Sequence, residues 1–327
     1  MAQTRIGFIG AGSIANRHLG NLLSFDDVRV AAIADVRLEQ AQETAQRCDA
    51  HAYGDLTEML ERESLDACYI CVPPFAHGAP EAAMIERDLP FFVEKPLAAD
   101  FEAAAVIARE IDAHNLVTAV GYHWRYLDTT ERARELLARN PAHLALGYWL
   151  DGTPPPRWWI KEGLSGGQMV EQTTHIFDLA RVLVGDVTRV YAATEKIARP
   201  AFPEADVPVV SVATLHFASG ALGTISSTCL LQWPHRIGLH LFGEGMALEL
   251  SEFELMVDIG HGRPVQHAQG DPFAREDRDF VDAVQGKANR IRVPYAEALE
   301  THRLVTTAAR AAHEGRVLDM SAPPASS

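Results

Sequence analysis

The first third of the chain alternates short apolar runs with stretches of helical periodicity. The apolar runs, each expected to form a strand, are residues 6–9, 28–34, 65–72, 91–93 and 117–120. The stretches between them, each expected to form a helix, are residues 14–23, 38–47, 56–63, 80–87 and 101–114. Alternating strands and helices are typical of βαβ units, because a parallel connection must cross over one face of the sheet. The pattern predicts an α/β domain, a doubly wound parallel Rossmann sheet, over residues 1–122.

The pattern changes after residue 122. A loop with Pro154-Pro155-Pro156 precedes one long helix candidate over residues 167–184. Alternating or β-branched runs then predict strands over residues 187–193, 207–217, 221–231, 236–242 and 247–250. Ser219-Gly220 lies where a tight hairpin turn belongs. With a final helix over about 296–313 and a frayed tail over 321–327, residues 123–327 are predicted to form an α+β domain with an open, mostly antiparallel sheet.

Composition and charge exclude several classes of function. The hydrophobic fraction of 47% and the charged fraction of 22% are those of an ordinary globular protein. The 29 basic against 44 acidic residues give a net charge of -15, which repels phosphate backbones and anionic lipid surfaces. We therefore expect no nucleic-acid partner and no membrane partner. The chain also has no run of about 18 apolar residues and no secretory leader, so neither a membrane span nor export is expected.

The four cysteines are too few and too scattered for a disulfide framework, which favours a reducing cytoplasm. Cys68 and Cys71 form a C-x-x-C inside an apolar run. Odd spacing on a strand points the two thiols to opposite faces. No second pair of cysteine or histidine follows at zinc spacing, so no metal site is expected.

A glycine-rich turn joins the first predicted strand to the first predicted helix. Gly10 permits the sharp turn, and Gly12 lets the backbone approach a pyrophosphate. Ser13 and Ile14 open the helix, whose free amide groups and partial positive charge attract an anion, and Ala15 permits close packing of helix on strand. This context predicts a dinucleotide-binding loop.

An acidic residue, Asp35, ends the second predicted strand. A carboxylate there accepts both hydroxyl groups of the adenosine ribose and repels the additional phosphate of NADP. NAD is therefore the favoured cofactor. Arg37 keeps NADP open, because a guanidinium beside the ribose clamps a 2′-phosphate.

Two further groups of residues are candidates for chemistry. Glu94-Lys95-Pro96 ends an apolar run at the expected carboxyl edge of the sheet, where ligands bind in open α/β folds. In the second half, Gly166-Gly167 precedes Glu171, His175 and Asp178, whose spacings of four and three place them on one face of a helix. A histidine between carboxylates is held in a defined tautomer and acts as a base near neutral pH. A solvated lysine and a core or surface histidine are the alternatives.

Aromatic residues gather between the cofactor half and this helix. Trp124, Trp149, Trp158 and Trp159 all fall there. Aromatic faces pack on sugar rings, and an arginine binds hydroxyl or carboxylate oxygens. The expected substrate contacts in this region are Tyr122, His123, Trp124, Arg125 and Trp158. The alternatives are that the aromatics fill the core and that the proline-rich segment 152–163 forms a lid.

These motifs together resemble the Gfo/Idh/MocA family, which groups glucose-fructose oxidoreductases, inositol dehydrogenases and their relatives. The resemblance runs from the first strand to the last helix. It rests on the glycine loop, Asp35, the segment from Cys71-Val72-Pro73-Pro74 to His77, Glu94-Lys95-Pro96, and Gly166-Gly167 with Glu171 and His175.

The resemblance implies an NAD(P)-dependent oxidoreductase that transfers a hydride between nicotinamide and a secondary alcohol or ketone of a sugar, sugar acid or cyclitol. It assigns Lys95 to the substrate hydroxyl and His175 to acid/base work. Glu171 stands where the family usually has Asp, and either orients the substrate or His175 or displaces part of a larger substrate. The remaining cofactor contacts that it implies are Pro73, His77, Glu94 and Lys95. It also implies a cis peptide bond before Pro96.

Two other functions stay open. Some relatives hold NAD tightly and use transient oxidation to cleave glycosidic bonds, and others are non-catalytic regulators that bind dinucleotide. The open sheet of the second domain needs a cover on its outer face, which predicts a homodimer or homotetramer through that sheet.

Overall fold

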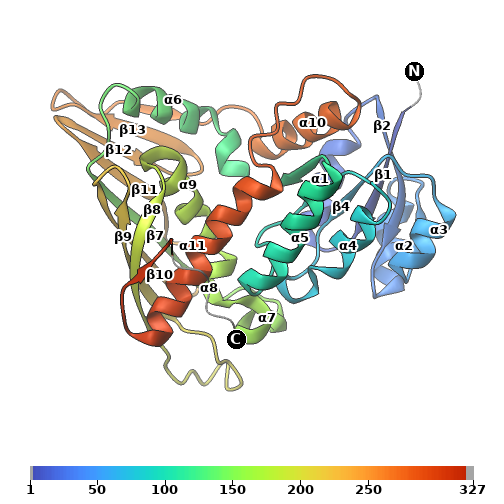
Figure 1. Cartoon of the computed structure of the whole chain (residues 1–327), viewed down its shortest axis with the longest axis horizontal. Helices are drawn as coiled ribbons and strands as arrows, with labels where there is room; N and C mark the ends of the chain where they lie inside the picture. The colour runs from blue at the N-terminus through green and yellow to red at the C-terminus, as the bar shows by residue number, and fades with distance from the viewer. Residues whose placement is uncertain (1–2, 322–327) are drawn as a thin grey trace. The chain divides into compact units, whose positions relative to one another are not determined.

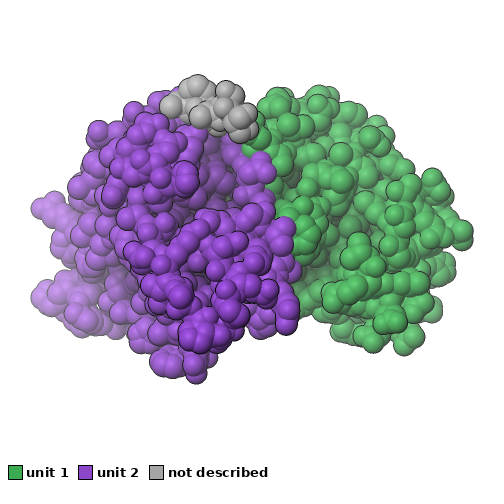
Figure 2. Space-filling model, turned by 90° about the horizontal axis from the view of Figure 1, so that it is seen from below, with its two compact units in different colours: residues 1–98, 102–126, 271–299 green, residues 99–101, 127–270, 300–327 purple. Residues whose placement is uncertain are grey.

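The computed structural model describes residues 3–321 and divides into two compact units (Figure 1). Unit 1 comprises Met1–Ala98, Glu102–Tyr126 and Asp271–Leu299, and unit 2 comprises Ala99–Phe101, Leu127–Gly270 and Glu300–Ser327 (Figure 2). The expected boundary after residue 122 is close to the end of the second segment of unit 1. It misses residues 271–299, which belong to unit 1 rather than to the second domain. Most of the tail expected to be frayed, residues 322–327, lies outside the described residues.

Unit 1 is built on a parallel sheet of six strands in the order β3-β2-β1-β4-β5-β6. The strands are β1 (Thr4–Ile9), β2 (Val28–Ala34), β3 (His51–Tyr53), β4 (Ala67–Ile70), β5 (Phe91–Val93) and β6 (Thr118–Val120). The helices between them are α1 (Ser13–Leu22), α2 (Leu38–Gln46), α3 (Leu56–Arg62), α4 (Ala79–Ile85) and α5 (Phe101–His114). The doubly wound sheet is confirmed. Among the six strands, only β3 has no counterpart in the sequence pattern, because it has three residues and one of them is buried.

The two faces of this sheet have separate apolar cores. Ile6 and Phe8 pack with side chains of α1, α2 and α10 (Pro272–Val284), whereas Ile9 packs with side chains of α3, α4 and α5. The alternation of strand side chains produces this division. Cys68 and Cys71 belong to different cores and are free, so the prediction of opposite faces is confirmed.

Helix α10 is absent from the sequence prediction for a physical reason. Asp271 caps it through a hydrogen bond from the amide of Phe273, and a proline follows the cap. Its buried side chains include Glu276 and Asp277 beside Phe280 and Val281. Because two of the buried positions are acidic, the helix lacks the apolar periodicity by which an amphipathic helix is predicted.

Unit 2 is built on a sheet of nine strands in the order β14-β13-β12-β11-β7-β10-β9-β8-β15. Its strands are β7 (Leu144–Gly152), β8 (Val187–Glu195), β9 (Val210–Phe217), β10 (Leu222–Leu231), β11 (Arg236–Gly243), β12 (Met246–Leu250), β13 (Glu254–Asp258), β14 (Val265–His267) and β15 (Leu318–Asp319). All neighbouring pairs are antiparallel except β7 with β10. The mostly antiparallel sheet is therefore confirmed. The central strand β7 has no counterpart in the sequence pattern, because its two fully buried positions are the small residues Ala145 and Gly147.

The prediction of a single helix over residues 167–184 is wrong. Two helices, α8 (Gly167–Glu171) and α9 (Thr174–Val184), take its place. The amide of Thr173 donates to the carbonyl of Gln168 five residues back, which ends the α-helical register. Glu171 therefore closes one helix while His175 and Asp178 begin the next, and the three do not share one helical face.

The other helices of the chain are α6 (Asp128–Leu137), α7 (Glu162–Ser165) and α11 (Tyr295–Glu314). Helix α11 confirms the final helix expected over 296–313. None of the helices within residues 3–321 combines the length and the apolar character that crossing a bilayer requires.

Candidate active site

The glycine loop of unit 1 has the geometry that an anion requires. Gly10 has a φ of +94°, and a Cβ added there would lie 2.3 Å from the carbonyl oxygen of Cys71. Only glycine fits this position. Gly12 precedes α1 without a side-chain cap, and a Cβ added there would meet no atom within 4 Å. Ser13 and Ile14 begin α1, and the contact of their amides with a phosphate stays a prediction.

Asp35 connects the end of β2 to this loop. Its Oδ2 accepts a hydrogen bond from the amide of Ala11 at 2.9 Å, and its Oδ1 accepts one from the amide of Arg37 at 2.8 Å. The Arg37 side chain is 71% exposed, with its Nε 3.7 Å from Asp35 Oδ1. The carboxylate is thus held beside the loop, with one guanidinium next to it.

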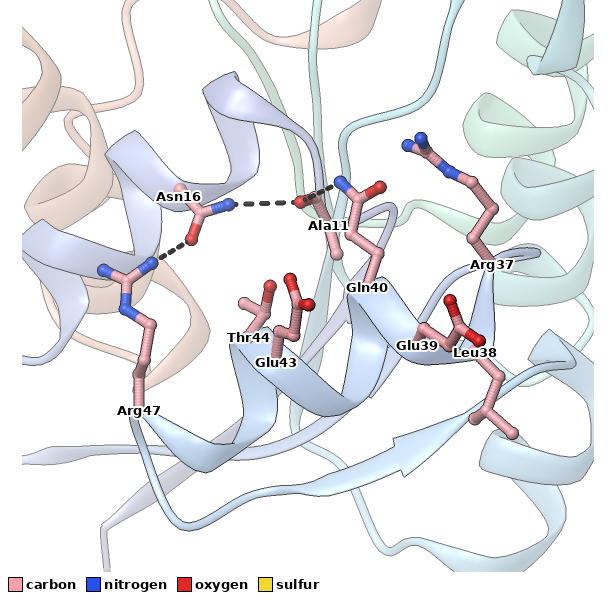
Figure 3. A pocket seen from close by; sticks show the side chains of 9 residues that line it. All are labelled: Ala11, Asn16, Arg37, Leu38, Glu39, Gln40, Glu43, Thr44 and Arg47. Atoms are coloured by element: carbon pink, nitrogen blue, oxygen red, sulfur yellow. Dashed lines mark hydrogen bonds between the residues drawn. The ribbon is translucent and has the colours of Figure 1, made fainter.

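A cavity of about 780 Å³ lies between the glycine loop and α2 (Figure 3). Its lining residues are Ala11, Asn16, Arg37, Leu38, Glu39, Gln40, Glu43, Thr44 and Arg47. Asn16 Nδ2 and Gln40 Nε2 both donate to the carbonyl of Ala11, at 3.1 and 2.6 Å, and Arg47 donates to Asn16 Oδ1. Two helices therefore hold the loop in one conformation, and the cavity opens beside the residues expected to bind the adenosine ribose.

The carboxyl edge of β5 holds the Glu94-Lys95-Pro96 segment. The Lys95–Pro96 peptide bond is cis, which confirms the expectation drawn from the resemblance. Glu94 is buried, and a Cβ on Gly121 would lie 2.3 Å from its Oε1. The glutamate thus packs against the end of β6, and the half-buried Lys95 follows at the edge where open α/β sheets bind ligands.

The loop after β4 contains Pro73 and His77. Pro73 is half-buried and starts a single 3-10 turn. His77 Nδ1 lies 2.6 Å from Glu81 Oε1, and both side chains are fully buried. Glu81 Oε2 accepts the amide of Gly78 at 2.6 Å. The structure thus gives His77 an internal role in ordering this loop, and its contact with cofactor stays a prediction.

The residues expected at the substrate between 122 and 125 are all buried within unit 1. Tyr122 belongs to one of the two cores, and Trp124 is 2% exposed. His123 stacks on Phe273 with ring centroids 4.0 Å apart. Arg125 Nη2 lies 3.1 Å from Glu297 Oε1. This burial favours the core-filling alternative for Tyr122 and Trp124, and the substrate contacts stay predictions.

In unit 2, glycine residues position the helix that carries His175. Gly166 and Gly167 have φ values of +74° and +78° and form the turn from α7 into α8. Gly147 on β7 lets α9 approach the sheet, because a Cβ there would lie 2.6 Å from Ile176 Cγ2. His175 is 4% exposed, and its ring lies nearly parallel to that of Trp149, at a centroid distance of 5.8 Å and an angle of 19°. The ring of His175 therefore lies nearly parallel to a side chain of β7.

The two carboxylates near His175 in the sequence have different partners. Glu171 Oε2 accepts a hydrogen bond from Trp159 Nε1 at 2.7 Å, and Trp159 is buried. Asp178 Oδ1 accepts one from Thr301 Oγ1 at 2.7 Å in a buried setting. Trp158, which is named among the substrate contacts, is half-buried beside Trp159. The sequence showed four tryptophans in this region but no signal for which of them holds the glutamate.

Two models of one protein family match the chain. Residues 4–122 match the oxidoreductase family with an NAD-binding Rossmann fold, and residues 141–249 match the GFO/IDH/MocA C-terminal domain. The two matches fall on the sheet of unit 1 and on the central strands of unit 2.

Relatives and solved structures agree with these matches. Myo-inositol 2-dehydrogenase of Thermotoga maritima is 28% identical over 244 residues, covering 73% of this chain and 72% of the relative. Inositol 2-dehydrogenase of Rhizobium meliloti is 26% identical and covers 97% of this chain and 99% of the relative. The WlbA dehydrogenase of Bordetella pertussis, solved with NADH and UDP-GlcNAcA, has the same fold at a TM-score of 0.86 and 21% identity, covering 98% of this chain and 100% of that one. This chain belongs to the Gfo/Idh/MocA family of NAD-binding oxidoreductases.

Proposed function

We propose that this protein is an NAD(P)-dependent dehydrogenase that acts on a secondary alcohol or ketone of a sugar, sugar acid or cyclitol. The observation that carries the proposal is that one chain has a lysine at the carboxyl edge of β5 and a buried histidine whose ring is nearly parallel to that of Trp149. The names of the relatives, which include a myo-inositol 2-dehydrogenase and an inositol 2-dehydrogenase, support a polyol as the substrate.

The residues of unit 1 fit a dinucleotide. Gly10 and Gly12 leave room for the pyrophosphate, the start of α1 supplies amide donors, and Asp35 accepts the ribose hydroxyl groups. A dinucleotide held by these residues would supply a nicotinamide ring as the acceptor of a hydride from the alcohol carbon, and the hydroxyl proton would be left for the protein to remove.

The side chains of this chain handle that proton and the charge on the oxygen. We assign proton removal to the imidazole of His175, which becomes an imidazolium as the hydroxyl O–H bond breaks. The ammonium group of Lys95 stabilises the alkoxide character that develops on the same oxygen. Glu171, held by Trp159, orients the substrate or His175, and Trp158 packs on the sugar ring. In the reductive direction, the imidazolium of His175 returns this proton to the substrate oxygen.

A substrate screen tests the proposal. Purified protein is incubated with myo-inositol, scyllo-inositol, glucose, gluconate and glucuronate, each with NAD and with NADP, and the absorbance of reduced nicotinamide is followed. We expect oxidation of at least one polyol, faster with NAD. A blank for all of them, together with glycoside cleavage without net NADH and retained cofactor, would support the glycosidase alternative. A blank without cleavage would support the regulator.

Changing Asp35 tests the cofactor site. Asp35→Asn keeps a carbonyl acceptor for only one of the two amides, Ala11 or Arg37, and removes the charge that faces the ribose. We expect the Kd for NADH to rise about tenfold, because a hydrogen bond to a charged acceptor contributes about 1.5–3 kcal/mol. The ratio of the Kd for NADPH to the Kd for NADH should fall. Fluorescence titration measures both affinities. Glu61→Gln removes an exposed carboxylate from α3 as the control, and equal effects of the two variants would contradict the assignment.

We propose that unit 2 self-associates through the outer face of its sheet. Apolar side chains on this face, Tyr191, Val212, Leu222 and Leu230, are each at least 41% exposed. An apolar surface of this kind favours a dimer or tetramer. We expect a solution mass at a multiple of 35.8 kDa and its reduction to the monomer by Val212→Lys. A 35.8 kDa species alone at micromolar concentration would overturn the proposal.

We also place the protein in the reducing cytoplasm. Its four cysteines are free, and Cys68, Cys71 and Cys229 are buried as thiols.

A further inference from the structure

Helix α1 carries a histidine in its buried stripe. The buried residues of the helix are Ala15, His18, Leu19 and Leu22. His18 is fully buried, with Nδ1 2.7 Å from Asp277 Oδ1 and Nε2 3.0 Å from Glu94 Oε1. A carboxylate oxygen opposite each ring nitrogen accepts a hydrogen bond when that nitrogen carries a proton, so the geometry is that of an imidazolium between two anions.

Both anions have a second hydrogen bond. Asp277 Oδ2 accepts one from Asn21 Nδ2 at 2.8 Å. Glu94 Oε2 accepts one from the backbone amide of Lys95 at 3.2 Å. The close approach of Gly121 to Glu94 leaves this carboxylate little room to turn. A continuous chain of hydrogen bonds therefore runs from α10 through His18 to the backbone of Lys95.

Aromatic rings surround the histidine and exclude water. The ring centroids of Tyr69, Phe92 and Phe273 lie 5.4, 4.8 and 5.8 Å from that of His18. Burial alone would lower the pKa of His18, but the charges and hydrogen bonds of Asp277 and Glu94 outweigh burial and raise this pKa well above its ordinary value. The imidazolium thus persists through neutral pH.

A third acid, Glu276, borders the cluster. It is buried, and neither of its carboxyl oxygens has a hydrogen-bond partner among residues 3–321. Burial raises the pKa of Glu276 well above its ordinary value; the charge of His18 opposes this shift, and the neighbouring acids add to it, which favours the neutral form. One ligand-type atom from each of His18, Glu94 and Glu276 lies within 4.8 Å of the others. With a proton on His18 and on Glu276, the positive charge of His18 balances the negative charge of Glu94, and the group has no net charge. We therefore interpret it as a hydrogen-bonded cluster rather than a metal site.

We propose that His18 is a positioning residue of the dehydrogenase, which fixes the backbone of Lys95 through Glu94. The proposal rests on the role assigned to Lys95 under the proposed function. An apolar side chain at position 18 would complete the buried stripe of α1, and replacing a buried ion pair by packed apolar groups is often neutral or stabilising. Stability alone therefore does not account for the cluster. The same helix begins at the phosphate loop, so one imidazolium links the cofactor-binding helix to the lysine.

Variants of the chain test this link by kinetics. His18→Gln and Glu94→Gln should each lower kcat by about 10- to 100-fold on the best substrate of the screen, because small displacements of a reacting group cost this much. In His18→Gln, whose side chain is not among the expected cofactor contacts, the Kd for NADH should change less than threefold. The double variant should be no slower than the slower single variant, since both break the same link. Thr118→Val is the matched control: it removes a buried acceptor for the amide of Tyr295 near the amino end of β6, so it should lower Tm but leave kcat within about twofold.

A spectroscopic readout keeps the proposal falsifiable if a variant folds poorly. NMR of protein with ¹⁵N-labelled histidine, assigned by the signal missing in His18→Gln, should show His18 as imidazolium at pH 8. In Glu94→Gln and Asp277→Asn it should lose its proton at lower pH. The titratable groups that face His18 are Asp277, Glu94, Glu276 and Tyr69, and Cys71 interacts with two of them, Glu94 and Asp277.

Several outcomes overturn the proposal. They are a neutral His18 at pH 8, an unchanged kcat in His18→Gln, and a stoichiometric metal in the purified protein that His18→Gln removes. The Lys95→Met variant separates this inference from the proposed function. If Lys95→Met loses activity while His18→Gln keeps it, only the positioning role fails. If Lys95→Met keeps full activity, the role assigned to Lys95 under the proposed function fails as well.

Discussion

Lys95→Met should lower kcat/KM by about 10²- to 10³-fold, the loss typical of removing one charge-stabilising group from a water-excluded site. Methionine keeps the methylene chain and the backbone amide that donates to Glu94, so the surrounding network stays in place. The substitution therefore removes the ammonium charge and little else. Steady-state kinetics with the best substrate of the screen measures the effect.

The control for Lys95 is a lysine with ordinary surface partners. Lys287 is half-exposed and pairs with Asp27 and Asp282 in unit 1. Lys287→Met removes the same charge from the same unit, and its kcat/KM should stay within about twofold of the wild type, since exposed ion pairs contribute little. Activity of Lys95→Met above a tenth of the wild-type value would contradict the role given to this lysine.

The sequence predicted the parts of the fold that long, regular patterns encode. The parallel sheet of unit 1 follows from apolar runs separated by helical periods, and Gly10 has the left-handed backbone that its turn position demands. The register break between α8 and α9 depends on one hydrogen bond, from Thr173 to Gln168, which no periodicity reports. Short-range patterns also cannot reveal that residues 271–299 return to unit 1.

Single residues of the candidate site could be predicted from the sequence, but their contacts could not. Glu94, Lys95, His175 and Asp35 stand out by residue type and position along the chain. His18 had a signal of its own, because a histidine in the buried stripe of α1 is an exception to an apolar pattern. Its two partners come from β5 and α10, and only the tertiary structure brings them together. Buried polar residues are thus the reason why the sequence predicted neither helix α10 nor the hydrogen bonds of His18 with Glu94 and Asp277.

His175→Asn should lower kcat by about 10²- to 10⁴-fold, the range for the loss of a general acid/base. Because His175 is assigned to the substrate proton and not to the dinucleotide, the Kd for NADH should stay within about threefold. The pH profile of kcat/KM should lose the limb that reports the ionisation of this base. His267→Gln, at a histidine that is 73% exposed on β14, should leave the profile unchanged. A retained limb in His175→Asn would contradict the assignment.

Combining His175→Asn with Lys95→Met tests whether the two residues act on one oxygen. Residues that act as a unit have non-additive effects on rate, because the loss of either one removes the benefit of the other. We expect the double variant to be about as slow as the slower single variant. Losses that multiply would mean that the lysine and the histidine serve separate steps. The hypothesis that Lys95 and His175 act on the same oxygen would then be wrong, although each residue would still contribute to the rate. Proton transfer and charge stabilisation would have to be assigned to different steps.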